Sequence, residues 1–412
     1  MMIFRPLLLC LMLTACGSGS DDDRPSDSPP VSGATMSLAS PSLRTIAGGT
    51  PIPINATLSS GGAVRWRLSA GAPGSLSAST GASVRYLPPA GAIATESIVT
   101  VTASGDGATA SLKLAVTPDP GPPGLRLIAG SGQRLTQDGI GAAASFASPN
   151  QLARDRPGNI YVMEYFYIGN AVWPAPRLRK IAPNGAVTTL AAIINGTYTW
   201  FGQPDTNGNG ASLDGANGME GDLEGNLYIA VARGHGHTGE IPGRAGAIFK
   251  IAPSGDMRLL AGTTEDLHLG VNIKPIDGTG GEARFVRPSL IGGDLDGNLF
   301  VFDGTNIPGL GLPLNSHVPR KATSSGVVTT LQAFPAHLNA DMNGNTYRFD
   351  QATNTIVRTT PEGVTSKEAD APYCDDYPSN VTSTCVTDII PEGGASYLII
   401  SGYRVVRMVV RH

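Results

Sequence analysis

Charged side chains are scarce in this chain of 412 residues. Asp, Glu, Lys and Arg make up 15% of it, against roughly 25% in an average soluble domain. The formal charge of −4 provides no basic surface of the kind that displaces counterions from nucleic acid, so nucleic acid is not expected as a partner. The apolar run at residues 7–13 is far shorter than the roughly 20 residues of a membrane-spanning helix, so it is not expected to span a membrane.

Recognisable catalytic motifs are absent as well. The sequence contains no GxSxG, HExxH, P-loop or dinucleotide-binding pattern. The recurring Asp-Gly-X-Gly sequences belong to a repeat described below, and we interpret them as turns rather than phosphate loops. No catalytic residue and no cofactor is therefore assigned from the sequence.

Glycine and proline are abundant instead, with 53 and 32 residues, and 41% of the chain is apolar. Together the two turn-forming residues stay below the roughly 25–30% that marks disordered, low-complexity chains. The apolar fraction is large enough for a substantial core. Many short strands joined by glycine-rich turns are expected, so the predicted fold class is all-β.

The N-terminus predicts export. Arg5 precedes the apolar run at residues 7–13, and small residues follow, which is the pattern of a secretory signal peptide. The sequence Leu13–Thr14–Ala15–Cys16 resembles the lipobox of bacterial lipoproteins. That resemblance implies removal of residues 1–15 as the signal peptide and acylation of Cys16; an ordinary signal peptide with a coincidental cysteine is the alternative.

Residues 16–33 follow as the lipidated cysteine and a segment rich in Ser, Asp, Pro and Gly. Such a segment buries too little apolar surface to fold, so we predict a disordered tether. Gly17, rather than Asp, follows the cysteine. The lipoprotein resemblance therefore implies a lipid anchor in the bacterial outer membrane, with the membrane itself as a partner.

Two cysteines remain for the exported protein, Cys374 and Cys385, because Cys10 leaves with the signal peptide and Cys16 carries the lipid. The compartment is oxidising, and a disulfide closing this loop would contribute about 3 kcal/mol in the chain-entropy model. We predict a structural disulfide between them. Neither a CxxC spacing nor a nearby histidine supports a redox or metal role.

Residues 34–117 alternate apolar and polar side chains in short runs, as in Ile52–Leu58 and Val64–Leu68, which predicts six or seven strands. Ser104–Gly105–Asp106–Gly107 is a hairpin signal. The WRLS, YLPP and VTVTASGDGATASLKLAV segments resemble bacterial Ig-like domains. The resemblance implies a β-sandwich with a buried tryptophan, Trp66, used as a spacer or stalk. Residues 118–124 are predicted to be a Pro/Gly linker.

Residues 125–412 contain an internal repeat. The unit at residues 138–162, DGIGAAASFASPNQLARDRPGNIYV, recurs without a gap at residues 277–301, and residues 205–229 fit the same frame. Shorter copies follow near residues 341–347 and 393–397. Pro-X-Gly turns in the second half of the units predict four hairpin-linked strands per unit. A four-stranded sheet cannot bury both faces alone, so the copies are expected to stack around an axis.

This signature resembles that of NHL-repeat β-propellers. The resemblance implies a propeller over residues 125–412, with about five four-stranded blades, six being possible. The chain ends with residues 405–410, which match a third strand, and Leu125–Gly130 matches the missing fourth. We therefore predict that residues 125–130 complete the last blade and leave no open sheet edge.

Three long insertions separate the second and third strands of the first three units, at residues 163–177, 230–247 and 302–319. Equivalent loops of successive blades lie on one face of a propeller, so these are predicted to build a binding rim. The first insertion carries aromatic side chains that suit a sugar or peptide, or that pack against the neighbouring blade: Tyr165, Phe166, Tyr167 and Trp173.

Three carboxylates share one register position where these loops open, namely Glu164, Asp303 and Asp350. They are candidate ligand-binding residues around the central channel; a structural hydrogen bond to the next strand is the alternative. Another set of aspartates recurs because each unit requires a turn residue there, and not as a catalytic set: Asp155, Asp222, Asp294 and Asp341.

Metal binding has weak candidates only. His235 and His237 lie in the second insertion, where an extended backbone directs both imidazoles toward one metal, but no certain third ligand is adjacent; a solvated loop is the alternative. Residues 205–210, DTNGNG, resemble the start of a calcium loop. The match fails at Ala216, where a glutamate is required, so a repeat turn explains them better.

Two functions follow as hypotheses. The first is a lipid-anchored binding protein of the cell envelope, whose propeller presents its long loops to a protein, peptide or glycan. The second is a secreted propeller enzyme of the lyase or lactonase type with a bound metal. Fold alone does not decide between them, but the lack of a catalytic motif favours the first.

Overall fold

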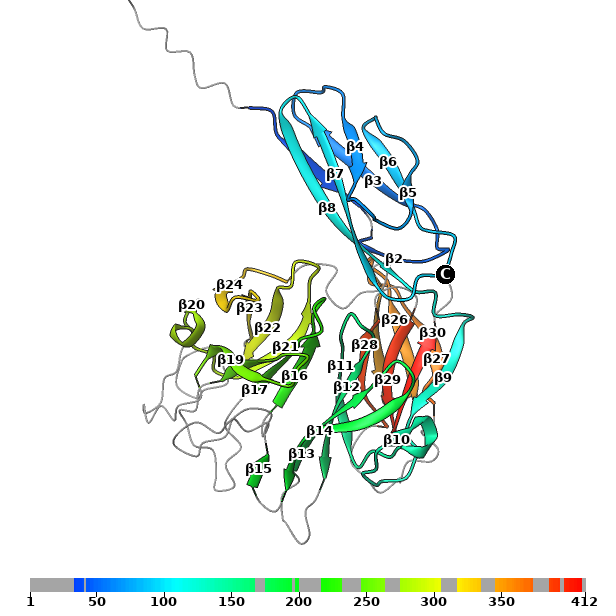
Figure 1. Cartoon of the computed structure of the whole chain (residues 1–412), viewed down its shortest axis with the longest axis vertical. Coiled ribbons are helices and arrows are strands. Elements are labelled where there is room, and N and C mark those ends of the chain that lie inside the picture. The colour runs from blue at the N-terminus through cyan, green and yellow to red at the C-terminus, as the bar shows by residue number, and fades with distance from the viewer. Residues whose placement is uncertain are drawn as a thin grey trace, which may run out of the picture.

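The computed structural model describes residues 33–40, 42–166, 175–194, 197–199, 216–231, 246–263, 275–304, 317–334, 345–372, 385–392 and 396–409. Within these ranges the regular structure is β-strand, apart from two 3-10 turns, η1 (Gly141–Ala143) and η2 (Gly280–Glu282). None of the helices in this part of the chain is long and apolar enough to span a membrane. The predicted all-β class is confirmed (Figure 1). The signal peptide and Cys16 lie outside the described residues.

The N-terminal unit, residues 34–117, consists of two four-stranded sheets. One has the order β1 (Met36–Ala39), β3 (Ile52–Leu58), β6 (Ser83–Leu87), β5 (Ser75–Leu76). The other has the order β2 (Arg44–Ile46), β8 (Ala108–Thr117), β7 (Ser97–Gly105), β4 (Arg65–Leu68).

Apolar residues of both sheets form one core, which includes Ile54, Trp66 and Leu114. The core explains the strict alternation seen in the sequence, because every second side chain of a strand faces the opposite sheet. The Trp66 indole, buried as expected, donates a hydrogen bond to the Gly81 carbonyl over 2.7 Å. The hairpin signal is also confirmed: Asp106 and Gly107 connect β7 to β8 with positive φ angles of 48° and 80°, as a tight hairpin turn requires.

The rest of the described chain forms five small sheets, here numbered I to V. Their members follow in spatial order. Sheet I is β10 (Gly139–Ile140), β14 (Ala186–Ile194), β13 (Ala175–Ile181), β12 (Ile160–Phe166) and β11 (Pro149–Arg154), with β15 (Thr197–Thr199) beside β14. Sheet II is β16 (Ala216–Gly221), β17 (Leu227–Val231), β18 (Ala247–Ile251) and β19 (Met257–Gly262). Sheet III is β20 (Gly278–Thr279), β24 (Val327–Thr330), β23 (His317–Ala322), β22 (Leu299–Gly304) and β21 (Pro288–Gly293). Sheet IV is β25 (Thr346–Asp350), β26 (Thr355–Thr359) and β27 (Thr365–Asp370). Sheet V is β28 (Val386–Pro391), β29 (Ser396–Ser401), β30 (Arg404–Val409) and β9 (Gly124–Ala129).

Separate apolar cores connect these sheets face to face. One core joins Met163 of sheet I to Ile229 of sheet II, and another joins Tyr228 of sheet II to Val301 of sheet III. Two further cores join sheet I to sheet V and sheet V to sheet IV. The sheets therefore stack in the order III, II, I, V, IV, each burying a face that it could not bury alone.

The predicted pairing of the first and last strands of this region is confirmed. Strand β9 lies antiparallel to β30, with Leu127 opposite Val406 and Leu125 opposite Met408. Sheet V is thus completed by residues that precede sheet I in the chain. This pairing connects the two ends of the repeat region directly.

Strands β11, β16 and β21, the first long strands of sheets I, II and III, are the inner strands of these sheets. Their backbones approach closely at glycine residues. A Cβ at Gly218 would lie 2.2 Å from the Leu290 carbonyl oxygen in β21, and one at Gly221 would lie 2.3 Å from the Arg154 carbonyl oxygen in β11. Only glycine permits such contacts between backbones. Strand β16 is therefore placed tightly between β11 and β21, and the three strands line one side of the cavity described next.

Candidate functional site

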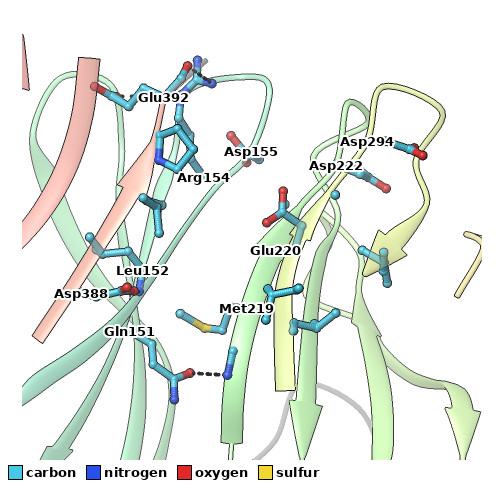
Figure 2. A pocket seen from close by; sticks show the side chains of 18 of the residues that line it. Gln151, Leu152, Arg154, Asp155, Met219, Glu220, Asp222, Asp294, Asp388 and Glu392 are labelled. Atoms are coloured by element: carbon cyan, nitrogen blue, oxygen red, sulfur yellow. Dashed lines mark hydrogen bonds and ion pairs between the residues drawn. The ribbon is translucent and has the colours of Figure 1, made fainter. Parts of the chain in front are cut away.

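A cavity of about 480 Å³ lies among the inner strands β11, β16, β21 and β28. Arg44 and Glu96 of the N-terminal unit also line it, so both parts of the described chain enclose the same space. Its size is within the range of about 300–1,000 Å³ that is usual for small-molecule sites. Figure 2 shows its lining, in which carboxylates are prominent.

Three of these carboxylates belong to the turns that the repeat predicted. Asp155 accepts hydrogen bonds from the backbone N–H and side-chain amide of Asn159, at 2.8 and 2.7 Å. Asp222 and Asp294 accept the same pair from Asn226 and Asn298. The structural interpretation of these aspartates is confirmed for the three described units, since each carboxylate closes its own turn.

Two more cavity carboxylates are held by arginine. Glu96 lies 3.1 Å from Nη1 of Arg154, and the same nitrogen donates to the Glu392 carbonyl over 3.2 Å. The Glu392 carboxylate accepts from Nη2 of Arg407 over 2.7 Å. Arg156 adds a hydrogen bond from Nε to the Glu96 carbonyl, at 2.9 Å. These contacts attach the N-terminal unit to sheets I and V.

Glu220 differs from all of these carboxylates. Within the described part of the chain its carboxylate has neither a hydrogen bond nor an ion pair. Figure 2 shows the side chain directed from β16 into the space before β11 and β28. Burial raises the pKa of Glu220 to about 7; Arg44 acts in the opposite direction but more weakly, and Glu96 adds to the rise.

Asp388, on β28, also lines the cavity and forms no ion pair among the described residues. It accepts backbone N–H groups only, from Leu152 at 2.6 Å and from Ile389 at 2.9 Å. Burial outweighs these hydrogen bonds and raises its pKa to about 6. Both Glu220 and Asp388 therefore titrate close to neutral pH.

Glu164 and Asp303, predicted to open loops, lie instead in strands β12 and β22, away from the cavity lining. Each is fully buried and paired with a buried arginine: Nη1 of Arg179 is 2.7 Å from Glu164, and Nη1 of Arg320 is 3.0 Å from Asp303. Burial raises the pKa of both carboxyls in spite of these partners. The geometry favours the structural alternative for both residues.

The same arginines contact the first aspartate of two repeats. Nη2 of Arg179 lies 2.7 Å from Asp138, and Nη2 of Arg320 lies 3.0 Å from Asp277. Burial alone would raise the pKa of Asp138, but hydrogen bonds from Thr189 and Arg179 outweigh it and lower the pKa. Sheets I and III thus carry the same Asp–Arg–carboxylate cluster.

Asp350, the third carboxylate of that register, ends β25, and no buried arginine pairs with it in the described part of the chain. It accepts N–H groups of Ala352 and Thr353 in its own turn, and Arg348 lies 3.8 Å away.

Of the aromatic candidates, Tyr165 and Phe166 belong to strand β12 rather than to a loop, because this strand and β13 extend further than the sequence predicted. Pairing of Tyr165 with Pro176 and of Phe166 with Ala175 accounts for the extension.

Several predicted site residues lie outside the described residues, and their roles stay predictions: Tyr167, Trp173, His235, His237, Cys16, Cys374 and residues 205–210. Cys385 is described and buried. Across the described ranges, no group of three or more His, Cys, Asp or Glu side chains is arranged to hold a metal ion.

Sequence reasoning missed Glu220 and Asp388. A signal for the first was present in the repeat. Glu220 pairs with Tyr228, and the residues at the same place in β11, β21 and β28 are Ala153, Gly292 and Ile390. A glutamate among small and apolar equivalents departs from the structural pattern. Asp388 lies on β28, in the degenerate last copy, whose first strand the sequence alignment of the repeat did not include.

Neither a family model nor a curated protein matches the chain. Three solved structures are similar at low TM-scores. A Bacteroides thetaiotaomicron protein of unknown function has a TM-score of 0.28 and 15% identity, over 93% of this chain and 99% of that one. A DUF4623 family protein from Bacteroides eggerthii has a TM-score of 0.28 and 13% identity, over 85% and 68%. A quinonprotein alcohol dehydrogenase-like protein from Bacteroides thetaiotaomicron has a TM-score of 0.21 and 11% identity, over 89% and 95%. Likenesses at this level assign no function to the chain.

Proposed function

We propose that the chain is a lipid-anchored binding protein of the bacterial cell envelope. In this proposal Cys16 carries the lipid in the outer membrane, residues 34–117 are an Ig-like stalk, and sheets I–V are the blades of an NHL-type β-propeller. The repeated Asp–Arg–carboxylate clusters of sheets I and III and the pairing of β9 with β30 support the propeller. A protein, peptide or glycan is bound by the long insertions.

The observation that carries this proposal is the position of the N-terminal unit. It contacts the ends of the sheets where the Asp155 and Asp222 turns lie, since Arg44 and Glu96 line the same cavity as these turns. The long insertions start at the other ends of the antiparallel strands β12, β17 and β22. The described chain begins, in dark blue in Figure 1, at the end of the N-terminal unit that is remote from sheets I–V. In this proposal the anchor precedes that remote end of the N-terminal unit, and strands β12, β17 and β22 end on the side of their sheets away from the N-terminal unit.

Membrane fractionation tests the anchor. The wild-type chain should sediment with outer membranes and dissolve only with detergent, whereas the Cys16→Ala chain should be released, because several acyl chains are needed for stable anchoring. A wild-type chain recovered in the soluble fraction would overturn the anchor.

Glycan and peptide arrays test the binding face. The detergent-purified full chain should bind a subset of envelope glycans or peptides, and Trp173→Ala or Tyr167→Ala should reduce that signal, since aromatic side chains supply most of the contact area in such sites. The matched control is Tyr347→Ala, which changes an aromatic residue on β25, whose ring packs against Tyr397. An unchanged signal for both loop variants would contradict the proposal.

An enzyme is the second candidate, and one observation favours it. Glu220 and Asp388 line one cavity and titrate near neutral pH, as acid–base catalysts do. The metal-dependent form of this hypothesis, with His235 and His237 as ligands, is tested by elemental mass spectrometry of the dialysed full chain. About one equivalent of zinc, iron or calcium per chain, lost in a His235→Ala/His237→Ala variant, would favour the enzyme.

A further inference from the structure

The carboxylates that line the cavity differ in their hydrogen bonds and ion pairs. Glu96 and Glu392 contact arginine, and the turn aspartates are hydrogen-bonded by asparagine. Asp388 accepts backbone N–H groups only, and Glu220 has neither a hydrogen bond nor an ion pair among the described residues. Burial makes each of these two carboxyls costly to ionise.

The arginines near Glu220 and Asp388 do not offset the free-energy cost of ionising these two carboxyls. Arg154 forms an ion pair with Glu96, and Arg156 donates a hydrogen bond to the Glu96 carbonyl. Arg44 acts on Glu220 without forming an ion pair within the described residues, and its effect is weaker than that of burial. The seven carboxylates of the lining outnumber its three arginines, and Glu220 borders about 480 Å³ of space without an ion pair among the described residues.

The size and the chemistry of the space exclude a bare metal ion as the natural occupant. Metal ions such as Ca²⁺ take six to eight oxygen ligands at roughly 2.3–2.6 Å, and no ligand group of that kind occurs in the described part of the molecule. An organic cation fills more volume and requires fewer direct contacts. Its N–H groups donate to carboxylates, and its carbon atoms suit the apolar part of the lining, Met219 and Leu290.

We infer that this cavity binds a small organic ammonium ion, with Glu220 as its principal counter-ion and Asp388 as the second carboxylate. The N-terminal unit completes the site, because Arg44 and Glu96 close it on one side. This function is separate from binding at the long insertions, and either can fail without the other. The Ig-like stalk of the proposed function would then also form one wall of a ligand site.

Calorimetry on the detergent-purified full chain tests the inference with three probes of similar length: 1,4-diaminobutane, 1,4-butanediol and succinate. The diamine should bind, and at about pH 8 it should bind at least about tenfold more tightly than the diol or succinate. Binding should weaken as the pH falls through the pKa values of Glu220, about 7, and Asp388, about 6, because protonation removes the charges that attract the ligand. At about pH 7, binding should release a fraction of a proton, measured as a dependence of the heat on the buffer.

The Glu220→Gln variant keeps the shape of the side chain and removes its charge, and should lose about tenfold or more in affinity for the diamine. Its matched control is Glu224→Gln, on the exposed turn just after β16, outside the cavity lining. Asp388→Asn is the second test variant, and thermal unfolding checks that each protein is folded. Equal affinity for the diol, pH-independent binding, an equal loss in the Glu224 variant, or no binding of the diamine would each overturn the inference.

Discussion

At the residue scale, the same amino acid serves two purposes according to what surrounds it. Glu164 is fully buried and paired with Arg179, so its charge is compensated within the fold. Glu220 lines a cavity and lacks such a partner among the described residues. A compensated buried carboxylate holds strands together, whereas an uncompensated one is available to a ligand. The repeat distinguishes them, because the Glu164 arrangement recurs at Asp303 and Arg320 while that of Glu220 does not.

Replacing Arg179 by Met should destabilise the protein by about 3–5 kcal/mol, because it removes the ion-pair partner of the buried Glu164 carboxylate. Urea unfolding measures the loss. Adding Glu164→Gln to this variant should restore part of the stability, since the uncompensated charge is then gone. Arg258→Met, at an exposed position of β19, is the control and should change stability little. An equal loss for Arg179 and Arg258 would contradict the structural role.

The raised pKa of Glu220 also predicts how stability depends on pH. The folded state binds the proton of this carboxyl more tightly than the unfolded chain does, so this contribution to stability is complete below about pH 4.5 and is lost as the pH rises through about 7. Glu220→Gln should therefore raise the melting temperature at about pH 8 more than at about pH 5. Scanning calorimetry at the two pH values measures this, and a pH-independent difference would show that the carboxyl is not buried.

At the element scale, glycine controls how closely the inner strands pack. Gly218 has a φ of 88° and lies against the backbone of Leu290 in β21, so both its conformation and its missing Cβ are needed. Gly297 has a φ of 76° with open space around it, so only its conformation matters. Comparing the two glycines therefore distinguishes the strain of a positive φ from the steric cost of a close strand contact. The sequence alone does not tell these two reasons for a glycine apart.

Gly297→Ala should cost roughly 1–2 kcal/mol, the strain of alanine at a positive φ. Gly218→Ala should cost at least about 3 kcal/mol, because strand β16 must also move away from β21. Chemical denaturation of both variants compares them. Similar losses would mean that β16 and β21 are not in close contact.

At the scale of the whole molecule, the contacts between the N-terminal unit and the sheets include one largely buried ion pair and one exposed ion pair. The pair between Glu96 and Arg154 is largely buried, with side chains 5% and 17% exposed, whereas Lys113 and Asp296 are 42% and 65% exposed. Exposed pairs contribute little, about 0–1 kcal/mol, because water and salt screen them. The buried pair should therefore dominate the attachment.

Limited proteolysis tests this at the linker, residues 118–124. Glu96→Gln should accelerate cleavage there, because Arg154 then loses its charged partner across the interface. Lys113→Ala is the control and should leave the rate nearly unchanged. A larger effect of the Lys113 substitution would show that the surface pair, and not the cavity wall, holds the two parts together.

The sequence by itself determined the features that depend on neighbouring residues or on the repeat. Strand alternation, the Asp106–Gly107 hairpin and the turn aspartates depend on short segments, and the match of residues 125–130 to a fourth strand follows from comparing repeat copies. Strand ends were less well predicted, because pairing with a partner extended β12 beyond the expected loop boundary.

Only the tertiary structure decided the cavity and its charges. Arg44, Glu96, Glu220 and Asp388 are far apart in the chain, and no local pattern relates them. Stacking of the sheets brings them to one space, and burial there, which no sequence pattern specifies, raises the pKa of Glu220 and Asp388. Long-range packing therefore turned ordinary carboxylates into a candidate site.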